Sequence, residues 1–496
     1  MEAMIRDDIK KLVEKAIKGL GFKVPKVLVE EPREKTHGDY ATNVAMMIVK
    51  EAKKNPMQIA EMIKAKIKSN IIDKIGIAKP GFINFFISKE YLQKQAGEIL
   101  KKKERFGNLK IGKGKKINVE FISANPTGPL TLGNGRGGFC GDILSNVLEK
   151  AGYNVCREYY IDDRGKQIED LKKGFYKGEK RTALQIQKEN QEFITRKLKI
   201  KFDNWFSEKS LYKNKEVDKV LAYLRKKELT YKKEGALWFK STKFGDDKDR
   251  VLIKKDGDYT YLASDVAYLR NKFNRRFDKL IYFWGADHHG YIKRIEAAAE
   301  ALGYKKEQMD FIIMQMVRLL EKGKQVKMSK RAGVYVTLEE LINEVGLDVA
   351  RFFFLIRSSG THLNFNLSLA KEKSQKNPVY YVQYAHARIC SILQKAKIRP
   401  DIKSLNELKE ESELDLIKQL IRFEEIIEDI SKDYQVQRIP QYAIDLAESF
   451  HRFYKNCRVL TDDKKLSQAR LSLILATQTV LKNTLDLMGI SSPEKM

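Results

Sequence analysis

The stretch INVEFISANPTGPLTLGNGRGGFCGDILSNVLEK, residues 117–150, decides how this chain is expected to fold. Residues 117–123 have the pattern of a buried strand, residues 124–138 are rich in proline and glycine, and residues 139–150 have the apolar spacing of a helix. Residues 153–161 form a second strand pattern. A strand, a glycine-rich connection, a helix and a strand make a βαβ unit, which predicts a parallel sheet.

The glycine-rich connection has two interpretations. Backbone N–H groups of such a turn, together with a helix N-terminus, suit a phosphate group. The loop has no GxxxxGK[ST] motif and matches GxGxxG poorly, so it is neither a P-loop nor a clear dinucleotide site. On glycine content alone, a tight turn without a ligand is the better interpretation.

Outside this unit the chain divides into segments of different character. Strand patterns return at residues 280–285 and 311–319, after a Lys- and Glu-rich segment, 170–231, that is expected to be a mostly helical insertion. Residues 1–110 mix helix (57–68) with strand (81–88), and the chain is expected to be helical from about residue 379 to its end. This order predicts an α/β protein with α+β and all-α flanking segments.

Composition narrows the possible functions. The 496 residues include 95 Lys and Arg against 66 Asp and Glu, so the formal net charge is +29. Such an excess fits a nucleic-acid partner or a lysine-rich surface equally well. Four dispersed cysteines and six histidines argue against a disulfide framework and a bound metal. No apolar run is long enough to cross a membrane, so a soluble, cytoplasmic protein is expected.

A second basic loop, KGKQVKMSKR at residues 322–331, follows the last predicted strand of the sheet. Lys327 and Lys330 could close over a triphosphate and stabilise a leaving pyrophosphate. Taken alone, the loop is better read as a solvated lysine run.

Together the two loops, one after the first strand and one after the last, resemble the HIGH and KMSKS signatures of class I aminoacyl-tRNA synthetases. The resemblance is closest to the arginyl-tRNA synthetases and covers essentially the whole chain. It rests on GDYATNVAM, GFINF, EFISANPTGPL, GALWFKSTKFGDDKDRVL, YLASDVAY, WGADHHGY, NPVYYVQYAHARI and GISSPEKM. It implies a Rossmann-type catalytic domain (111–375) with the helical insertion, an α+β N-terminal domain (1–110) and an all-α anticodon-binding domain (376–496).

The resemblance implies a binding site for ATP, brought in as its Mg²⁺ complex, with no metal of the protein's own. The family usually has histidine at both ends of the HIGH tetrad, where this chain has Thr131 and Asn134. Both are hydrogen-bonding residues, so an altered but active site is expected; the alternative is a catalytically impaired, tRNA-binding protein. Catalytic roles are expected for Thr131, Asn134, Lys327 and Lys330. The expected ATP-binding residues are Thr131, Leu132, Gly133, Asn134, Gly135, Lys327, Met328, Ser329 and Lys330.

An arginine pocket should offer carboxylates to the planar guanidinium group. Glu120 and Asp265 are the candidates, and Tyr261 lies on the same helical face as Asp265. The resemblance adds the remaining expected arginine-binding residues, which are Ser123, Ala124, Asn125, Asn134 and His288. The alternatives are a helix cap or surface acid for Asp265, and a structural histidine pair for His288.

The predicted partners are L-arginine, ATP and tRNA(Arg), joined by a monomeric enzyme through an arginyl-adenylate. The resemblance also implies that tRNA is needed for the first step. Aromatic and basic side chains near the two chain ends could stack on unpaired bases. The candidate tRNA-binding residues are Phe82, Asn84, Tyr381, Tyr384, Arg388, Tyr454, Arg458 and Met496. Some of these could instead belong to a helical core or, for Asn84, to a strand.

Overall fold

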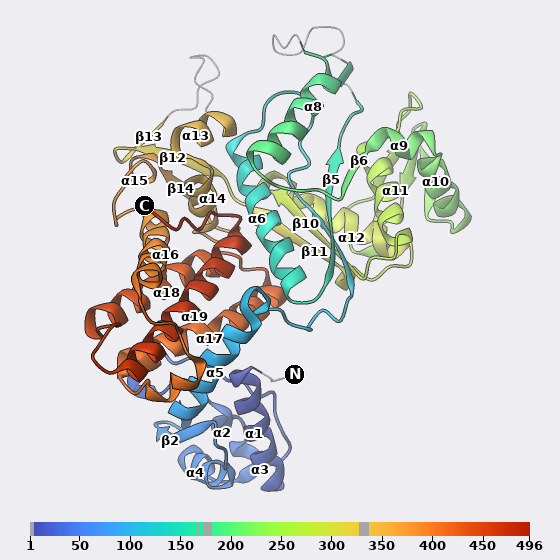
Figure 1. The fold of residues 1–496 in the computed structure, drawn as a ribbon. Coiled ribbons are helices and arrows are strands. Elements are labelled where there is room, and N and C mark those ends of the chain that lie inside the picture. Colours follow the sequence, from blue (N-terminus) through green and yellow to red (C-terminus); the bar gives the residue numbers. More distant parts are fainter. Residues whose placement is uncertain (1–3, 166–167, 170, 172–180, 327–336) are drawn as a thin grey trace.

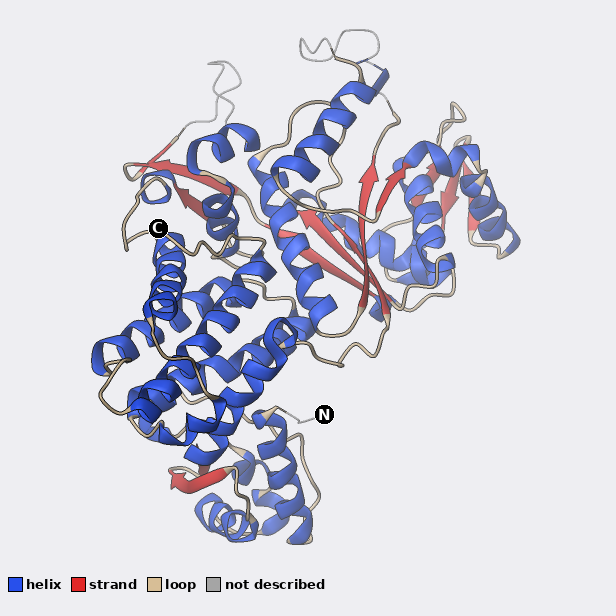
Figure 2. Cartoon of the chain, in the orientation of Figure 1, coloured by secondary structure: helices blue, strands red, loops and turns tan. Residues whose placement is uncertain are grey.

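The computed structural model describes residues 4–165, 168–169, 171, 181–326 and 337–496. Its centre is a five-stranded parallel sheet with the strand order β11-β10-β4-β5-β6. The strands are β4 (Lys116–Glu120), β5 (Asn154–Ile161), β6 (Asn204–Ser207), β10 (Lys279–Gly285) and β11 (Met309–Met314). The predicted α/β fold built on a parallel sheet is therefore confirmed (Figure 2).

Both faces of this sheet are covered by helices because its strands alternate apolar residues between two cores. Ile281 and Phe283 belong to the core that contains Phe139 of α6 (Leu132–Lys150). Leu280 and Tyr282, the alternate residues of β10, belong to a second core with α11 (Tyr261–Asn274) and α12 (Ile292–Ala301). This sandwich holds the carboxyl ends of the strands in a fixed register.

Helix α6 begins at Leu132, earlier than predicted, so residues 132–138 of the glycine-rich connection are helical. Two long-range contacts explain why glycine is used there. A Cβ atom on Gly135 would lie 2.5 Å from Leu338 Cδ1, and one on Gly141 would lie 2.3 Å from Phe121 Cγ. The glycines therefore let the helix pack closely against its neighbours, and the local pattern of a loop was misleading.

The predicted helical insertion is only partly helical. It contains α8 (Ala183–Glu192), a π-helical turn (Phe193–Lys197), α9 (Glu208–Lys213) and α10 (Glu216–Lys226), but strand β6 within it extends the central sheet. A small antiparallel sheet follows, made of β7 (Thr230–Lys233), β8 (Ala236–Phe239) and β9 (Arg250–Ile253).

The predicted strand at residues 311–319 is two strands in different sheets. Its first part belongs to β11, and its second part is β12 (Val317–Glu321), which pairs with β13 (Lys324–Gln325) and β14 (Leu363–Asn366). The same region contains α13 (Leu338–Val345), α14 (Leu347–Leu355) and α15 (Leu367–Ala370). The continuous apolar pattern hid the break because both strands are partly buried.

The N-terminal part is an α+β unit, and the C-terminal part is a helical bundle, as predicted (Figure 1). The first contains α1 (Ile5–Gly19), β1 (Tyr40–Thr42), α2 (Val44–Met47), α3 (Val49–Ala52), α4 (Pro56–Lys66), β2 (Ile72–Ala78), β3 (Phe82–Ile87) and α5 (Lys89–Lys102). The second contains α16 (Pro378–Lys395), α17 (Glu411–Asp433), α18 (Arg438–Asn456) and α19 (Lys464–Met488). Short 3₁₀ turns lie at Lys35–His37, Lys103–Arg105, Ser241–Phe244, Ala286–Tyr291, Lys306–Gln308 and Ile402–Glu407.

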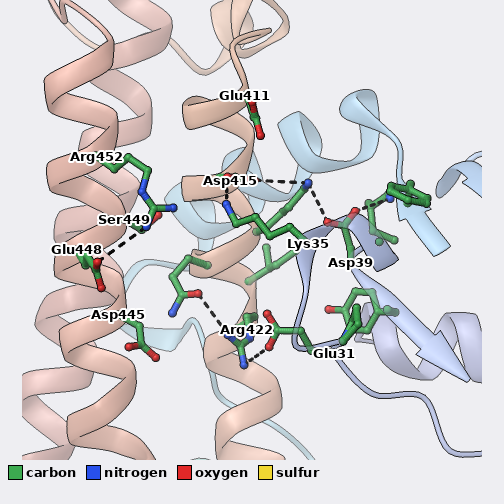
Figure 3. A pocket seen from close by; sticks show the side chains of 18 residues that line it. Glu31, Lys35, Asp39, Glu411, Asp415, Arg422, Asp445, Glu448, Ser449 and Arg452 are labelled. Carbon is green, nitrogen blue, oxygen red and sulfur yellow. Dashed lines mark hydrogen bonds and ion pairs between the residues drawn. The ribbon is translucent and has the colours of Figure 1, made fainter. Parts of the chain in front are cut away.

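Helix α17 joins these two parts through ion pairs that line a cavity of about 490 Å³ between them (Figure 3). Lys418 Nζ lies 2.8 Å from Asp39, and Arg422 and Asp415 pair with Glu31 and Lys35. Arg6 of α1 adds a further pair with Asp429, at 2.7 Å, outside this cavity. These charges satisfy one another across the boundary, so they fix the N-terminal unit on the bundle.

No helix among the described residues is long and apolar enough to cross a membrane.

Candidate functional site

A cavity of about 490 Å³ opens at the carboxyl ends of the parallel strands, where open α/β sheets bind their ligands. Its walls come from the end of β4, from β5 and the residues after it, from the start of α9, from one face of α11 and from the end of β10. The polar and aromatic lining residues are Glu120, Ser123, Asn125, Tyr160, Asp162, Glu208, Tyr261, Asp265, Tyr268, Tyr282, Phe283, Trp284, His288 and Tyr291.

The charge of this lining is one-sided. Four carboxyl groups face the cavity, from Glu120, Asp162, Glu208 and Asp265, while no lysine or arginine is among the described residues that line it. In a chain with a net charge of +29, such a lining must be built for a cationic ligand rather than inherited from the average surface.

The carboxyl groups of Asp265 and Glu208 are perturbed by this environment. Burial, together with the charges of Glu120 and Asp162, raises the pKa of Asp265 to about 7, although the hydroxyl of Tyr291 donates a hydrogen bond to it. Burial and the hydrogen-bonded carboxyl of Asp162 raise the pKa of Glu208 to about 8. A bound cation would lower the pKa of both carboxyl groups, because it favours their ionised forms.

Aromatic rings complete the cavity wall. The rings of Tyr160 and Tyr268 have centroids 4.6 Å apart, and those of Tyr282 and Trp284 are 5.5 Å apart. Tyr261 stands at the rim with 62% of its surface exposed. Ring faces of this kind attract a planar cation, so the wall and the carboxyls favour the same ligand.

The backbone after β4 is strained where it borders the cavity. Ile122 and Ser123 both have positive φ angles, 66° and 42°. This turn brings the Ser123 Oγ atom within 3.4 Å of Glu120 Oε1, while the same Oγ accepts a hydrogen bond from the backbone N–H of Tyr160 at 3.1 Å. Non-glycine residues keep such angles only where the surrounding structure enforces them, and functional sites are common places for this.

Six of the eight predicted arginine-binding residues line this cavity: Glu120, Ser123, Asn125, Tyr261, Asp265 and His288. Ala124 and Asn134 do not. Ala124 borders a separate small cavity, where its carbonyl accepts a hydrogen bond from the Tyr159 hydroxyl at 3.0 Å. Asn134 lies in the first turn of α6 and is engaged with Thr131.

Sequence reasoning missed Asp162, Glu208 and Tyr291. Asp162 comes directly after the predicted strand that ends at residue 161, so the rule that ligands bind beyond strand ends could have found it. Glu208 lies in the segment expected to be a helical insertion, and it reaches the cavity only because β6 extends the sheet. No local pattern identifies Tyr291.

The predicted ATP site begins at the N-terminus of α6. Thr131 and Asn134 form a capping box, in which Asn134 Oδ1 accepts hydrogen bonds from the Thr131 backbone N–H at 2.9 Å and from its hydroxyl at 2.8 Å. Gly133 is exposed, whereas Leu132 and Gly135 are buried, so these two positions serve packing. The predicted residues Lys327, Met328, Ser329 and Lys330 lie outside the described residues.

The predicted tRNA-binding residues fall on two surfaces. On α16 and α18, the guanidinium of Arg388 lies over the rings of Tyr384 and Tyr454, 4.8 and 5.2 Å from their centroids. Arg458 and Met496 are exposed, while Tyr381 packs partly against the core. In the N-terminal unit, Phe82 and Asn84 of β3 border one cavity of about 270 Å³, where Phe82 is exposed and Asn84 is buried.

Within the described ranges, no three His, Cys, Asp or Glu side chains are grouped so that they could hold a metal ion.

Comparison with known proteins covers the chain from end to end. Residues 4–87 match the arginyl tRNA synthetase N terminal domain, residues 95–209 and 179–354 the catalytic domain of tRNA synthetases class I (R), and residues 382–496 the DALR anticodon binding domain. Arginine--tRNA ligase 1 of Halalkalibacterium halodurans is 44% identical over 555 residues, which span 100% of this chain and 99% of that protein.

Solved structures agree in fold. The arginyl-tRNA synthetase of Thermus thermophilus has a TM-score of 0.80 at 21% identity, over 99% of this chain and 100% of that one. The enzyme of Plasmodium falciparum has a TM-score of 0.81 at 21% identity, over 100% of both chains. Family models that match all three parts, a full-length relative at 44% identity and an acidic cavity at the strand ends lead to one conclusion: this chain belongs to the arginyl-tRNA synthetases of class I.

Proposed function

We propose that the amino-acid site of this arginine–tRNA ligase is the carboxyl-lined cavity beyond strands β4, β5 and β10. The observation that carries the site assignment is the lining itself, with four carboxyl groups and no lysine or arginine among its described residues. Arginine is the amino acid whose side chain is a planar, permanently charged donor of five hydrogen bonds.

Asp265 and Glu208 are the residues that we assign to the guanidinium. They come from different helices, α11 and α9, so they can approach a planar fork from two directions. The hydroxyl of Tyr291 holds Asp265 in place, and Tyr261 closes the rim. Lysine would leave these carboxyls incompletely paired, which gives discrimination without an editing step.

Ser123, Asn125 and Glu120 are assigned to the backbone end of the substrate, because they lie at the end of β4, next to the N-terminal turn of α6 in the chain. His288 borders the same cavity, with its Nε2 atom 3.5 Å from Asp287. With the backbone end of arginine at the end of β4, the substrate carboxylate faces the nucleotide.

ATP enters as its Mg²⁺ complex and is assigned to the first turn of α6, whose free N–H groups and helix dipole attract phosphate. Thr131 and Asn134 replace the histidines of the HIGH signature, and their capping box keeps that turn intact. Lys327 and Lys330 are assigned to the leaving pyrophosphate.

In the first step, a carboxylate oxygen of arginine attacks the α-phosphorus of ATP, and the bond to pyrophosphate breaks. A ribose hydroxyl at the 3′ end of tRNA(Arg) then attacks the carbonyl carbon, and AMP leaves. The protein contributes positioning and electrostatic stabilisation, without a covalent enzyme intermediate.

For tRNA, we assign residues 1–110 and 376–496 to the two recognition domains and residues 111–375 to catalysis. The surface of Tyr384, Arg388 and Tyr454, with Tyr381, Arg458 and Met496 beside it in the same domain, is assigned to the anticodon, and the cavity of Phe82 and Asn84 to another part of tRNA. Paired rings and an arginine suit unpaired bases. The enzyme is proposed to act as a cytoplasmic monomer.

Arginine-dependent ATP–pyrophosphate exchange in the presence of tRNA(Arg) tests the proposed reaction. We expect exchange with arginine to exceed exchange with lysine, ornithine and citrulline by at least about 1,000-fold in kcat/KM. Absence of exchange with every amino acid would favour a tRNA-binding protein without catalysis. Preference for another amino acid would overturn the pocket assignment.

Replacing Arg388 with alanine tests the anticodon surface. We expect the KM for tRNA to rise about tenfold, because base stacking on such a platform contributes about 1–3 kcal/mol, while the KM for arginine stays unchanged. Arg438→Ala is the matched control, since it removes an equal charge from α18 at a guanidinium already bonded to Asp433 at 2.7 and 2.8 Å. Equal effects of the two variants on tRNA binding would mean that Arg388 contributes only its charge, and the proposed stacking surface would be refuted.

A further inference from the structure

A fully buried lysine lies directly beneath the carboxyl-lined cavity. Lys272 on α11 has 0% of its surface exposed and is not among the residues that line the cavity. Its ammonium group donates a hydrogen bond to Glu120 Oε2 at 2.6 Å. The rings of Tyr282 and Tyr268, which do line the cavity, lie 4.1 and 4.7 Å from the same nitrogen.

Burying an ammonium group is costly, and an apolar residue of similar volume would often serve the fold as well or better. The neighbouring carboxylate, Glu158, does not require Lys272, because Arg275 pairs with it through both terminal guanidinium nitrogens, Nη2 at 2.8 Å. Asn204 donates a further hydrogen bond to Glu158 at 2.6 Å. Lys272 Nζ lies 3.9 Å from Glu158, so its close partner is Glu120.

The two oxygens of Glu120 are therefore unequal. Oε2 accepts a hydrogen bond from Lys272 and lies 3.0 Å from the hydroxyl of Tyr268, whose single proton has a closer acceptor in Glu158 Oε1 at 2.5 Å. Oε1 has a single contact at hydrogen-bond distance among the described residues, the long one of 3.4 Å from Ser123 Oγ. The short contact with Lys272, at 2.6 Å, holds the carboxylate in one orientation and leaves the other oxygen available to a ligand.

We propose that Lys272 is a positioning residue for the amino-acid substrate. It occupies Glu120 Oε2, so that Oε1 is presented to bound arginine in a fixed orientation. Its positive charge also offsets the crowding of carboxyl groups around the cavity, where Asp162, Glu208 and Asp265 lie within one lining. This inference rests on the proposed function, because it requires that Glu120 contact arginine.

Lys272→Met tests the proposal, since methionine fills most of the same space without the charge. We expect the KM for arginine to rise about tenfold or more, because a loosened contact group misplaces the substrate. The kcat, the KM for ATP and the KM for tRNA should each change less than about threefold. Steady-state exchange kinetics measured well below the melting temperature of the variant provide this split.

Arg470→Met is the control for the loss of a buried ion pair as such. Arg470 Nε donates to Glu413 at 2.6 Å in the helical bundle, where the two side chains are 9% and 0% exposed, against 0% and 8% for Lys272 and Glu120. This variant should lose thermal stability and keep its KM for arginine. A similar rise in KM in both variants would mean that Lys272 has a structural role only.

Glu120→Gln separates two hypotheses, the contact of Glu120 with arginine and the positioning role of Lys272. If this variant keeps the KM for arginine of the original protein, Glu120 does not contact the substrate and the pocket assignment of Glu120 fails. If it raises that KM and Lys272→Met does not, the assignment stands and the positioning role of Lys272 is refuted. Should Lys272→Met fail to fold, Lys272→Gln takes its place, because it removes the same charge with a polar side chain one atom shorter; an unchanged KM for arginine in this variant would refute the positioning role.

Discussion

Replacing Asp265 with asparagine is expected to lower kcat/KM for arginine by about 100-fold or more and to leave the KM for tRNA within about twofold. The substitution keeps the size of the side chain but removes a charge that lies beside Tyr291 in the cavity. Truncating one partner of a desolvated charge pair costs about 2–5 kcal/mol, which corresponds to this loss. An amide also places an N–H group where the guanidinium needs an acceptor.

The measurement is arginine-dependent pyrophosphate exchange with saturating tRNA. Asp310→Asn is the matched control, because Asp310 lies on β11, outside the cavity lining, and pairs with Lys279 at 2.7 Å. We expect the control to change kcat/KM for arginine less than about threefold. Unchanged arginine kinetics in Asp265→Asn would remove Asp265 from the site.

The affinity for arginine is expected to rise about 50-fold between pH 6 and pH 7 and to level off above about pH 9. Burial and neighbouring carboxyl groups raise the pKa of Asp265 to about 7 and that of Glu208 to about 8. The guanidinium stays charged throughout and binds the ionised carboxylates. Below these pKa values the groups are protonated in the free pocket, so binding must expel protons and becomes weaker as the pH falls.

Calorimetric titration of arginine at pH 7 in two buffers with different ionisation heats measures this release directly. We expect a net release of about 1.4 protons per arginine bound, and a smaller release in Asp265→Asn. The raised pKa values also make the stability of the folded chain depend on pH. Both carboxyls keep their protons in the folded chain above the pH at which they ionise in the unfolded chain, so stability without ligand should decrease from about pH 5 to pH 8. A binding constant independent of pH would contradict the coupling.

Part of the site could be predicted from local sequence. Tyr261 and Asp265 lie four residues apart on α11 and reach the same cavity, as their helical spacing indicated. Glu120 and Ser123 lie where the first strand ends, and the parallel sheet brings strand ends together. Such predictions succeed because the spacing along one helix or strand translates directly into one face or one edge.

The remaining part depends on contacts between distant segments. Glu208 joins the cavity only because β6 pairs with β5, from Glu158–Asn204 to Ile161–Ser207. The glycines of α6 resembled a loop because local propensity disfavours glycine in a helix, and only the approach of Leu338 and Phe121 explains their use. In both cases the deciding partner lies far away in the sequence.

The sequence alone determined the family of this protein, the alternation of strands and helices and six of the residues that line the carboxyl-lined cavity, because those features are written in local periodicity and in family motifs. Only the tertiary structure decided which charges are buried and with which partners. Lys272 lies in a basic stretch that looks solvated, yet it contacts Glu120 across 152 positions of the chain. The physical reason is that the free energy of a buried charge depends on what surrounds it, and those surroundings are assembled from segments that have no local signal for one another.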